Sequence, residues 1–169
     1  VNGLRFKPFL RVDTIQEQVR RVAAEIRNDY EGKSPIFLCV LNGAFVFAAD
    51  LYRELAMTNS KIQFVKYSSY EGTNTTGNVK QAMGLTADIT GRRVIVVEDI
   101  VDSGNTIVEL KRILEEKGAS ESRICTLLFK PEAYKKDIKL DYVAMEIPND
   151  FIVGFGLDYD ELGRNLKDI

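Results

Sequence analysis

Three carboxylates lie within five residues of one another near the middle of the chain, and a turn of small polar residues follows them. Glu98, Asp99 and Asp102 can accept hydrogen bonds from a diol or help to hold a divalent cation. The turn at residues 103–106 leads into a predicted helix, whose free N–H groups and dipole attract phosphate. The combination favours a ligand that carries both hydroxyl groups and phosphates, such as a sugar phosphate.

Two common phosphate-binding motifs are absent from the sequence: neither G-x-x-x-x-G-K-[ST] nor G-x-G-x-x-G occurs. A purely structural alternative is a solvated turn in which Asp102 or Ser103 caps the helix. The three acids have no basic partner within the loop, and this disfavours the structural alternative.

The segments on either side of the acids indicate how they are positioned. Residues 94–97 are apolar and β-branched, which is typical of a buried strand. After the turn, apolar residues recur at helical spacing over residues 107–117, and Gly118 follows. The unit is therefore strand, acidic loop and helix, and ligands of open α/β sheets bind outside the carboxyl ends of the strands.

Residues 96–106, VVEDIVDSGNT, resemble the phosphoribosyl pyrophosphate (PRPP) signature of type I phosphoribosyltransferases. Over nearly its full length the chain resembles the hypoxanthine(-guanine) branch of that family. The resemblance implies that Glu98 and Asp99 bind the ribose of PRPP and that Asp102, near purine N7, is the catalytic base. It implies a 5′-phosphate site formed by Asp102, Ser103, Gly104, Asn105 and Thr106.

A second loop follows the apolar run at residues 36–41. By resemblance, Leu41, Asn42 and Gly43 form the pyrophosphate loop, which often contains a non-proline cis peptide, here between Leu41 and Asn42. Gly43 would let backbone amides approach a phosphate. Many relatives carry Lys where Asn42 stands, so this chain lacks a cation there. From the residues alone, an ordinary Asn-Gly turn is an equal alternative.

Ser69 and Tyr70 match the Ser-Tyr pair of the family's lid, which the polar residues 71–79 would continue. A lid would keep water from a ribosyl cation-like transition state. Composition alone favours an ordinary surface loop.

The base that accepts the phosphoribosyl group is indicated only by resemblance. Lys130, at a strand end, would hydrogen-bond the purine 6-oxo group and select 6-oxopurines over adenine. Phe151 would stack on the purine, the Ile152 backbone would pair with its edge, and Asp158 would complete this segment by binding Mg²⁺. Arg164 would contact pyrophosphate, and Glu98 and Asp99 are further candidate metal ligands. The structural alternatives are a solvated lysine for Lys130, a core aromatic residue for Phe151 and a strand-end cap for Asp158.

The order of predicted elements indicates an α/β fold with a central, mostly parallel twisted sheet flanked by helices. We expect one domain over residues 1–169, with a core at about 15–140 and a small hood from residues 1–14 and 141–169. Thr14 to Glu17 reads as a capping box. Helices are predicted over 15–30, 45–57 and 107–117, and strands over 36–41, 61–67, 80–85, 94–97, 123–129, 142–145 and 152–155.

Composition narrows the function classes. The net charge is −2, which disfavours a dedicated nucleic-acid binder, and no apolar run approaches the ~20 residues of a membrane span. Cys39 and Cys125 lie in apolar runs and are predicted to be buried free thiols in a reducing cytoplasm. The chain has no histidine, so histidine catalysis and histidine-ligated metals are excluded.

The sequence therefore predicts Mg²⁺-dependent transfer of phosphoribosyl from PRPP to N9 of hypoxanthine, with guanine as a second acceptor, in the cytoplasm. The resemblance also implies a homodimer or homotetramer. One alternative is a sister phosphoribosyltransferase for xanthine. Another is a PRPP-sensing regulator that binds nucleic acid, which the acidic composition and the retained Asp102 disfavour.

Overall fold

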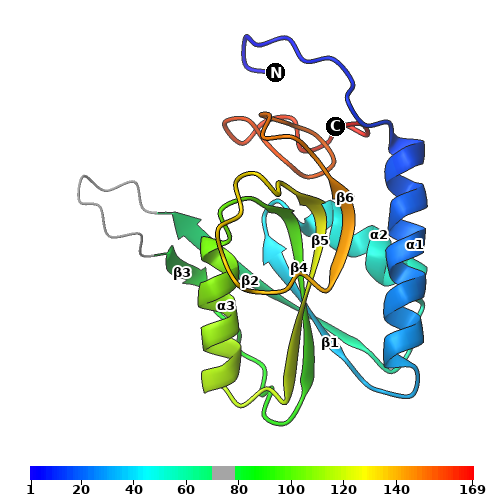
Figure 1. Cartoon of the computed structure of the whole chain (residues 1–169), viewed down its shortest axis with the longest axis vertical. Helices are drawn as coiled ribbons and strands as arrows, with labels where there is room; N and C mark the ends of the chain where they lie inside the picture. The colour runs from blue at the N-terminus through cyan, green and yellow to red at the C-terminus, as the bar shows by residue number, and fades with distance from the viewer. Residues whose placement is uncertain (70–78) are drawn as a thin grey trace.

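The computed structural model describes the backbone of residues 1–69 and 79–169, and the side chains of these residues except 68, 69 and 79–83. Figure 1 shows a sheet with helices on both faces. The elements are α1 (Val12–Tyr30), β1 (Ile36–Leu41), α2 (Phe45–Leu55), β2 (Lys61–Ser69), β3 (Val79–Met83), β4 (Arg93–Val101), α3 (Asn105–Glu116), β5 (Glu121–Phe129) and β6 (Tyr142–Glu146).

The described strands form a sheet in the order β3-β2-β1-β4-β5-β6. All pairs are parallel except β2 with β3, so the predicted α/β fold is confirmed. Because β6 pairs with β5, the sheet extends to residue 146.

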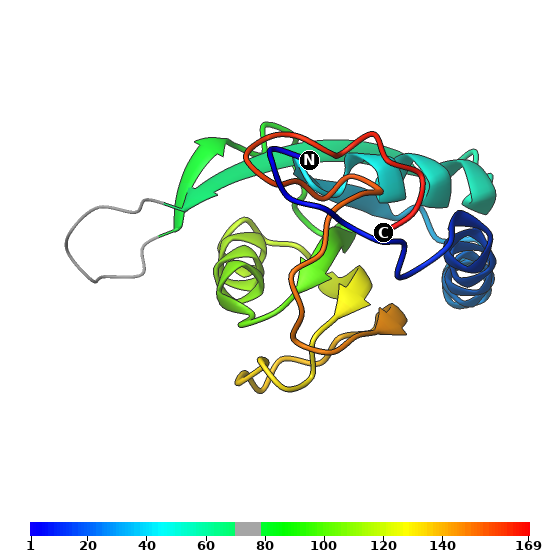
Figure 2. The same ribbon diagram turned by 90° about the horizontal axis from the view of Figure 1, so that it is seen from above.

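Two hydrophobic cores fill the spaces on either side of the sheet. Figure 2 shows α1 and α2 against one face and α3 against the other. Alternate residues of β1 and β4 point into opposite cores, as the pleat of a strand requires. Phe37, Cys39, Ile95 and Val97 join the core beneath α1 and α2, whereas Ile36, Leu38, Val94 and Val96 join the core beneath α3.

The buried face of α1 is the predicted one, but the helix begins earlier than predicted. The buried residues are Ile15, Val19, Val22, Ala23, Ile26 and Tyr30, as their spacing predicts. The capping box at Thr14 is wrong, because the helix begins at Val12 and Thr14 lies within the first turn. The Val12 N–H instead donates to Asp168 Oδ1 at 2.7 Å, so the cap comes from the far end of the chain.

The strand predicted over residues 152–155 is also wrong. Gly154, Phe155 and Gly156 have φ angles of 110°, 49° and 100°, and three successive positive φ values cannot continue a strand. The segment folds into a tight turn that makes only an isolated bridge between Gly154 and Leu157.

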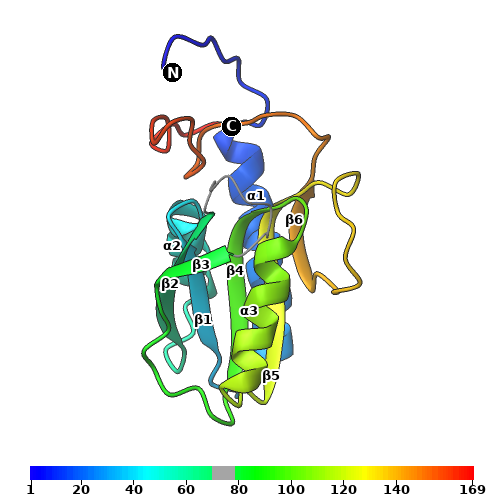
Figure 3. The ribbon, with the colours of Figure 1, turned by 90° about the vertical axis from the view of Figure 1, so that its left-hand side faces the viewer.

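The order of the strands creates one preferred ligand edge. After β1 the chain builds β2 and β3 on one side, then crosses to β4 on the other side of β1. Ligands of open α/β sheets bind at such a switch point, outside the carboxyl ends of the strands. Figures 1 and 3 show both chain ends above this edge. The hood is predicted over residues 1–14 and 141–169, and we use this name for residues 1–11 and 147–169, because α1 begins at Val12 and β6 ends at Glu146.

Both cysteines are buried free thiols, as predicted. Among the described residues, no helix combines the length and the apolar character needed to cross a membrane.

Candidate active site

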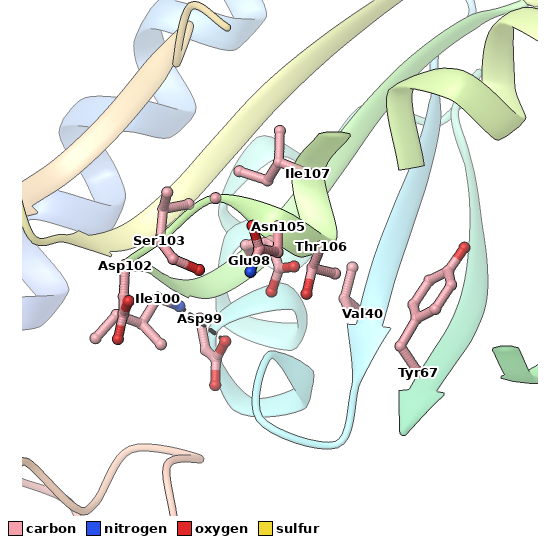
Figure 4. A pocket seen from close by; sticks show the side chains of 12 residues that line it. Val40, Tyr67, Glu98, Asp99, Ile100, Asp102, Ser103, Asn105, Thr106 and Ile107 are labelled. Atoms are coloured by element: carbon pink, nitrogen blue, oxygen red, sulfur yellow. Dashed lines mark hydrogen bonds between the residues drawn. The ribbon is translucent and has the colours of Figure 1, made fainter. Parts of the chain in front are cut away.

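A pocket of about 320 Å³ lies at the carboxyl end of β4, beside the first turn of α3. It brings together all the residues that the sequence predicts for ribose and 5′-phosphate binding. Figure 4 shows Glu98 below the start of α3 and Asp99 turned towards the loop that follows β1. The lining residues are Val40, Tyr67, Glu98, Asp99, Ile100, Val101, Asp102, Ser103, Gly104, Asn105, Thr106 and Ile107.

The paired acids belong to the strand itself and not to the loop after it. β4 continues to Val101, and the ladder to β5 pairs Glu98 with Thr126 and Val101 with Phe129. The prediction that the strand ends before Glu98 is therefore wrong by four residues. Two strands thus hold the paired acids rigidly, and only Asp102 lies on the connecting turn.

Glu98 and Asp99 form a buried acidic pair. Glu98 is 5% exposed, and burial, followed by the charge of Asp99, raises its pKa well above the ordinary value. Burial also raises the pKa of Asp99, although the Ile100 N–H, which donates to Asp99 Oδ1 at 2.8 Å, opposes this. In the described part of the chain neither acid forms an ion pair. The pair is therefore suited to a cation or a hydroxyl donor from a ligand.

We expect Glu98→Gln to stabilise the ligand-free protein at neutral and alkaline pH. A raised carboxyl pKa favours the folded state fully below the unfolded-state pKa, and this contribution is lost as pH rises through the folded-state pKa. Gln carries no charge, so it removes the buried charge that opposes folding at high pH. The free energy of unfolding should exceed that of the wild type by about 1–3 kcal/mol at pH 8, the cost of an unsatisfied buried group.

Urea unfolding at pH 5 and pH 8, without Mg²⁺ or nucleotide, measures this difference. The advantage of the variant should shrink at pH 5, because the raised pKa favours protonation of the wild-type acid as the pH falls. Glu132→Gln, at an exposed position, is the matched control and should leave the free energy of unfolding unchanged at both pH values. An advantage of Glu98→Gln that is equal at both pH values would contradict the electrostatic explanation.

The turn after the acids presents the N-terminus of α3 to the pocket. Gly104 is the N-cap with φ 87°, and no side chain among the described residues caps the helix. A Cβ at Gly104 would lie 2.6 Å from Tyr134 Cε2, so only glycine fits. The structural alternative, in which Asp102 or Ser103 caps α3, is wrong. The first N–H groups of the helix are therefore available to an anion.

The loop after β1 meets the acids from the other side of the switch point. The peptide between Leu41 and Asn42 is cis, as the resemblance predicted. A Cβ at Gly43 would lie 1.8 Å from Asp99 Oδ2, so the carboxylate rests directly on the Gly43 backbone. On the opposite side, a Cβ at Gly156 would lie 2.4 Å from the Gly43 carbonyl oxygen. Because Gly43 and Gly156 have no side chain, the loop after β1, the end of β4 and the turn at Gly156 can meet.

The third segment carries Asp158 and Arg164. Arg164 Nη2 lies 3.2 Å from Asp158 Oδ1, and Nη1 donates to the Gly156 carbonyl at 2.9 Å. Asp158 Oδ2 accepts the Glu161 N–H and so caps a turn, whereas the alternative of a strand-end cap is wrong because no strand in the described part of the chain ends there. The Gly156 carbonyl that Arg164 binds belongs to the turn that meets Gly43, so this turn brings the guanidinium towards the loop after β1.

The predicted purine-binding residues lie at the same edge. The Lys130 N–H donates to the Val101 carbonyl at 2.9 Å, and this residue is only 8% exposed, so the alternative of a solvated lysine is wrong. Phe151 is 62% exposed, which excludes a core aromatic residue. Ile152 is half-buried between Phe151 and the turn at Gly154.

Of the predicted lid, Ser69 ends β2 and Tyr70 lies outside the described residues. Tyr67 was missed as a lining residue of the pocket. Its hydroxyl is buried without a hydrogen-bond partner among the described residues, and burial raises its pKa to about 12. The partial alternation of residues 61–67 was the available signal, but a register shift after Lys66 interrupts it.

The sequence matches the model of the phosphoribosyl transferase domain over residues 11–160. A hypoxanthine-guanine phosphoribosyltransferase of Streptococcus thermophilus is 42% identical over 155 residues, which cover 91% of this chain and 86% of the relative. The corresponding Mycobacterium bovis protein is 40% identical over 94% of this chain and 82% of its own length. A crystal structure of such an enzyme from Bacillus anthracis, with HEPES in the active site, has a TM-score of 0.90 at 42% identity and covers 96% of each chain.

Proposed function

The chain belongs to the phosphoribosyltransferase family, in its hypoxanthine-guanine branch, and on this premise we propose that it transfers phosphoribosyl from PRPP to N9 of hypoxanthine or guanine. The products would be IMP or GMP, together with pyrophosphate. One observation carries the proposal: paired buried acids and an uncapped helix N-terminus share a pocket, and a buried lysine lies at the neighbouring strand end.

The pocket supports binding of the ribose phosphate half of PRPP. The 5′-phosphate would accept hydrogen bonds from the N–H groups at the start of α3 and from Ser103 and Thr106. The ribose hydroxyls would donate to Glu98 and Asp99, which have no other charged partner among the described residues. This binding fixes the anomeric carbon for displacement, and such positioning can supply about 7–11 kcal/mol of the barrier.

The pyrophosphate half would lie between the loop after β1 and the turn at Gly156. Arg164 is the candidate cation for this position, because its guanidinium binds the carbonyl of Gly156, whose turn meets the loop after β1. It would exchange its pairing with Asp158 for the leaving oxygens, which also approach the amides around Asn42 and Gly43. Since Asn42 supplies no charge, Arg164 carries a large share of this stabilisation.

The donors at this edge fit a hard divalent cation such as Mg²⁺, which prefers oxygen ligands. The candidate ligands are the pair Glu98 and Asp99, and Asp158, and the cation would neutralise the charge of the departing pyrophosphate. Within the described ranges, no three acidic, cysteine or histidine side chains come together as a metal site, so the protein would supply only one or two of the ligands. Oxygens of PRPP and water would therefore complete the coordination, as is usual for Mg²⁺.

The acceptor would be selected by Lys130 and activated by Asp102. A protonated lysine donates to a 6-oxo group but faces a donor in adenine, so the choice of base follows from hydrogen-bond polarity. Asp102 lies on the exposed turn after β4. It would take the proton from N7 as the new bond to N9 forms.

Initial rates with hypoxanthine, guanine, xanthine and adenine, each with PRPP and with or without Mg²⁺, test the proposal. We expect turnover of the first two bases, little of adenine, and loss of activity when Mg²⁺ is chelated. Lys130→Met should lower the preference for hypoxanthine over adenine about 10- to 100-fold, as loss of a charge-assisted hydrogen bond does. Lys135→Met, at an exposed position, is the control. A strong preference for xanthine would instead identify a sister enzyme.

We also propose that the protein forms a homodimer or homotetramer in the cytoplasm. One solved relative, a hypoxanthine phosphoribosyl transferase of Trypanosoma cruzi, is described in terms of its oligomeric state and C-terminal region. The two free cysteines support a reducing compartment. Light scattering across a concentration series measures the assembly.

A further inference from the structure

The N-terminal arm, residues 1–10, is fastened to the C-terminal part of the hood. Asn2 Nδ2 donates to Asp160 Oδ2 at 2.7 Å. Nearer to α1, the Phe9 and Leu10 N–H groups both donate to the Ile169 carbonyl, and the Ile169 N–H donates back to Leu10. Figure 2 shows the arm running across the C-terminal segment. The arm is therefore held at both ends.

Phe6, between these attachments, turns an aromatic ring towards the predicted purine-stacking residue. Its ring centroid lies 6.2 Å from that of Phe151 and 6.4 Å from that of Tyr159. Phe151 and Tyr159 are 5.5 Å apart and nearly perpendicular, at 81°. Phe6 is half-buried, whereas its neighbours Arg5 and Lys7 are exposed. Phe151 thus has two aromatic neighbours and remains the most exposed large apolar side chain described, at 62%.

We propose that Phe6 is a positioning residue for purine binding, which holds the ring of Phe151 in the orientation that stacks on the base. This inference rests on the proposed function, because it assumes that Phe151 contacts the purine. An exposed aromatic side chain samples several rotamers, and a ligand that selects one of them must compensate for the lost entropy. The tilted contact from Phe6, at 42°, and the edge contact from Tyr159 restrict the ring before the base arrives and leave much of its surface open.

The arm is suited to this task because its attachments lie outside the pocket proposed for the ribose phosphate half of PRPP. None of Asn2, Phe6 or Leu10 lines that pocket. Loss of the Phe6 ring should therefore affect the purine and not PRPP. A residue that only stabilised the hood would affect both substrates, because Asp158 and Arg164 lie in the same segment.

The test is steady-state kinetics of Phe6→Leu with each substrate varied in turn. We expect KM for hypoxanthine to rise about three- to tenfold, the range that one aromatic contact supports. KM for PRPP and kcat should stay within about twofold of the wild type, and Phe6→Tyr, which keeps the ring, should restore KM for hypoxanthine. Leu4→Ala, on the same arm but at an exposed position, is the control and should leave both KM values unchanged.

Tyr159→Leu removes the other neighbour of Phe151 and should show the same selective rise, so the inference does not depend on one variant folding. Thermal unfolding by circular dichroism establishes that each variant is folded. An unchanged KM for hypoxanthine in Phe6→Leu, or equal rises for both substrates, would overturn the positioning role. Failure of the proposed function looks different, because the wild type itself would then not turn over hypoxanthine.

Discussion

Asp102→Asn is expected to slow the chemical step of phosphoribosyl transfer about 10²- to 10⁴-fold, the usual contribution of a general base. The side chain is exposed on the turn between β4 and the N-cap Gly104. An amide occupies the same volume but does not take the proton from N7. IMP binding should change little, because the neighbouring backbone and the Glu98 and Asp99 pair remain in place. Rapid-quench single-turnover measurements, with enzyme in excess over hypoxanthine, report the step directly.

Asp137→Asn provides the control, because Asp137 is likewise exposed but lies in the connection between β5 and β6. Calorimetric titration with IMP separates binding from chemistry. Equal single-turnover rates in wild type and Asp102→Asn would remove Asp102 from the role of base. A large loss of IMP affinity with an unchanged rate constant would assign it to nucleotide binding instead.

Gly43→Ala is expected to reduce kcat/KM for PRPP at least about 100-fold, which corresponds to ~2.7 kcal/mol of lost stabilisation. The added methyl carbon would lie 1.8 Å from Asp99 Oδ2 and 2.7 Å from Asp99 Cγ, so the carboxylate must rotate away. That movement breaks the hydrogen bond from the Ile100 N–H and removes an acceptor from the ribose site. Steady-state rates with PRPP varied measure the effect.

A double-mutant cycle shows whether Asp99 is the cause. Asp99→Ala removes the atoms that the new methyl group would meet, so Gly43→Ala combined with Asp99→Ala should be about as active as Asp99→Ala alone. Additive losses in the double variant would mean that Gly43→Ala acts elsewhere, for example on the Gly156 turn. Thermal unfolding of all three variants shows whether each is folded, so that a loss of activity is not mistaken for a loss of structure.

Local patterns predicted those parts of the fold that local forces determine. Both ends of β1 were predicted correctly, because a continuous apolar run is typical of a strand that is buried on both faces. The buried face of α1 followed from its spacing. The start of α1 did not, because Asp168, 156 residues away, supplies its cap. A capping box describes only what neighbouring residues could do, and here a distant carboxylate takes that place.

The candidate site shows the same division between local and distant information. The acids, the turn and α3 were predicted together because they are consecutive. The meeting of Gly43 with Asp99 and Gly156 depends on close backbone approach, which single glycines in three separate segments do not indicate in advance. The contact between Phe6 and Phe151 had no signal at all, because an isolated aromatic residue near the start of a chain suggests no partner 145 positions later.

The carboxylate that caps α1 also links the order of folding to the completion of the site. Asp168 accepts the Val12 N–H through its side chain, and its carbonyl oxygen lies 2.1 Å from the position that a Cβ on Gly154 would take. The strand pairs of the described sheet all lie before residue 147, so the sheet can form before residues 147–169 join it. The purine side of the proposed site and the first turn of α1 must wait for residue 168. A folding chain can therefore hold a nearly finished sheet while the proposed purine site is still incomplete.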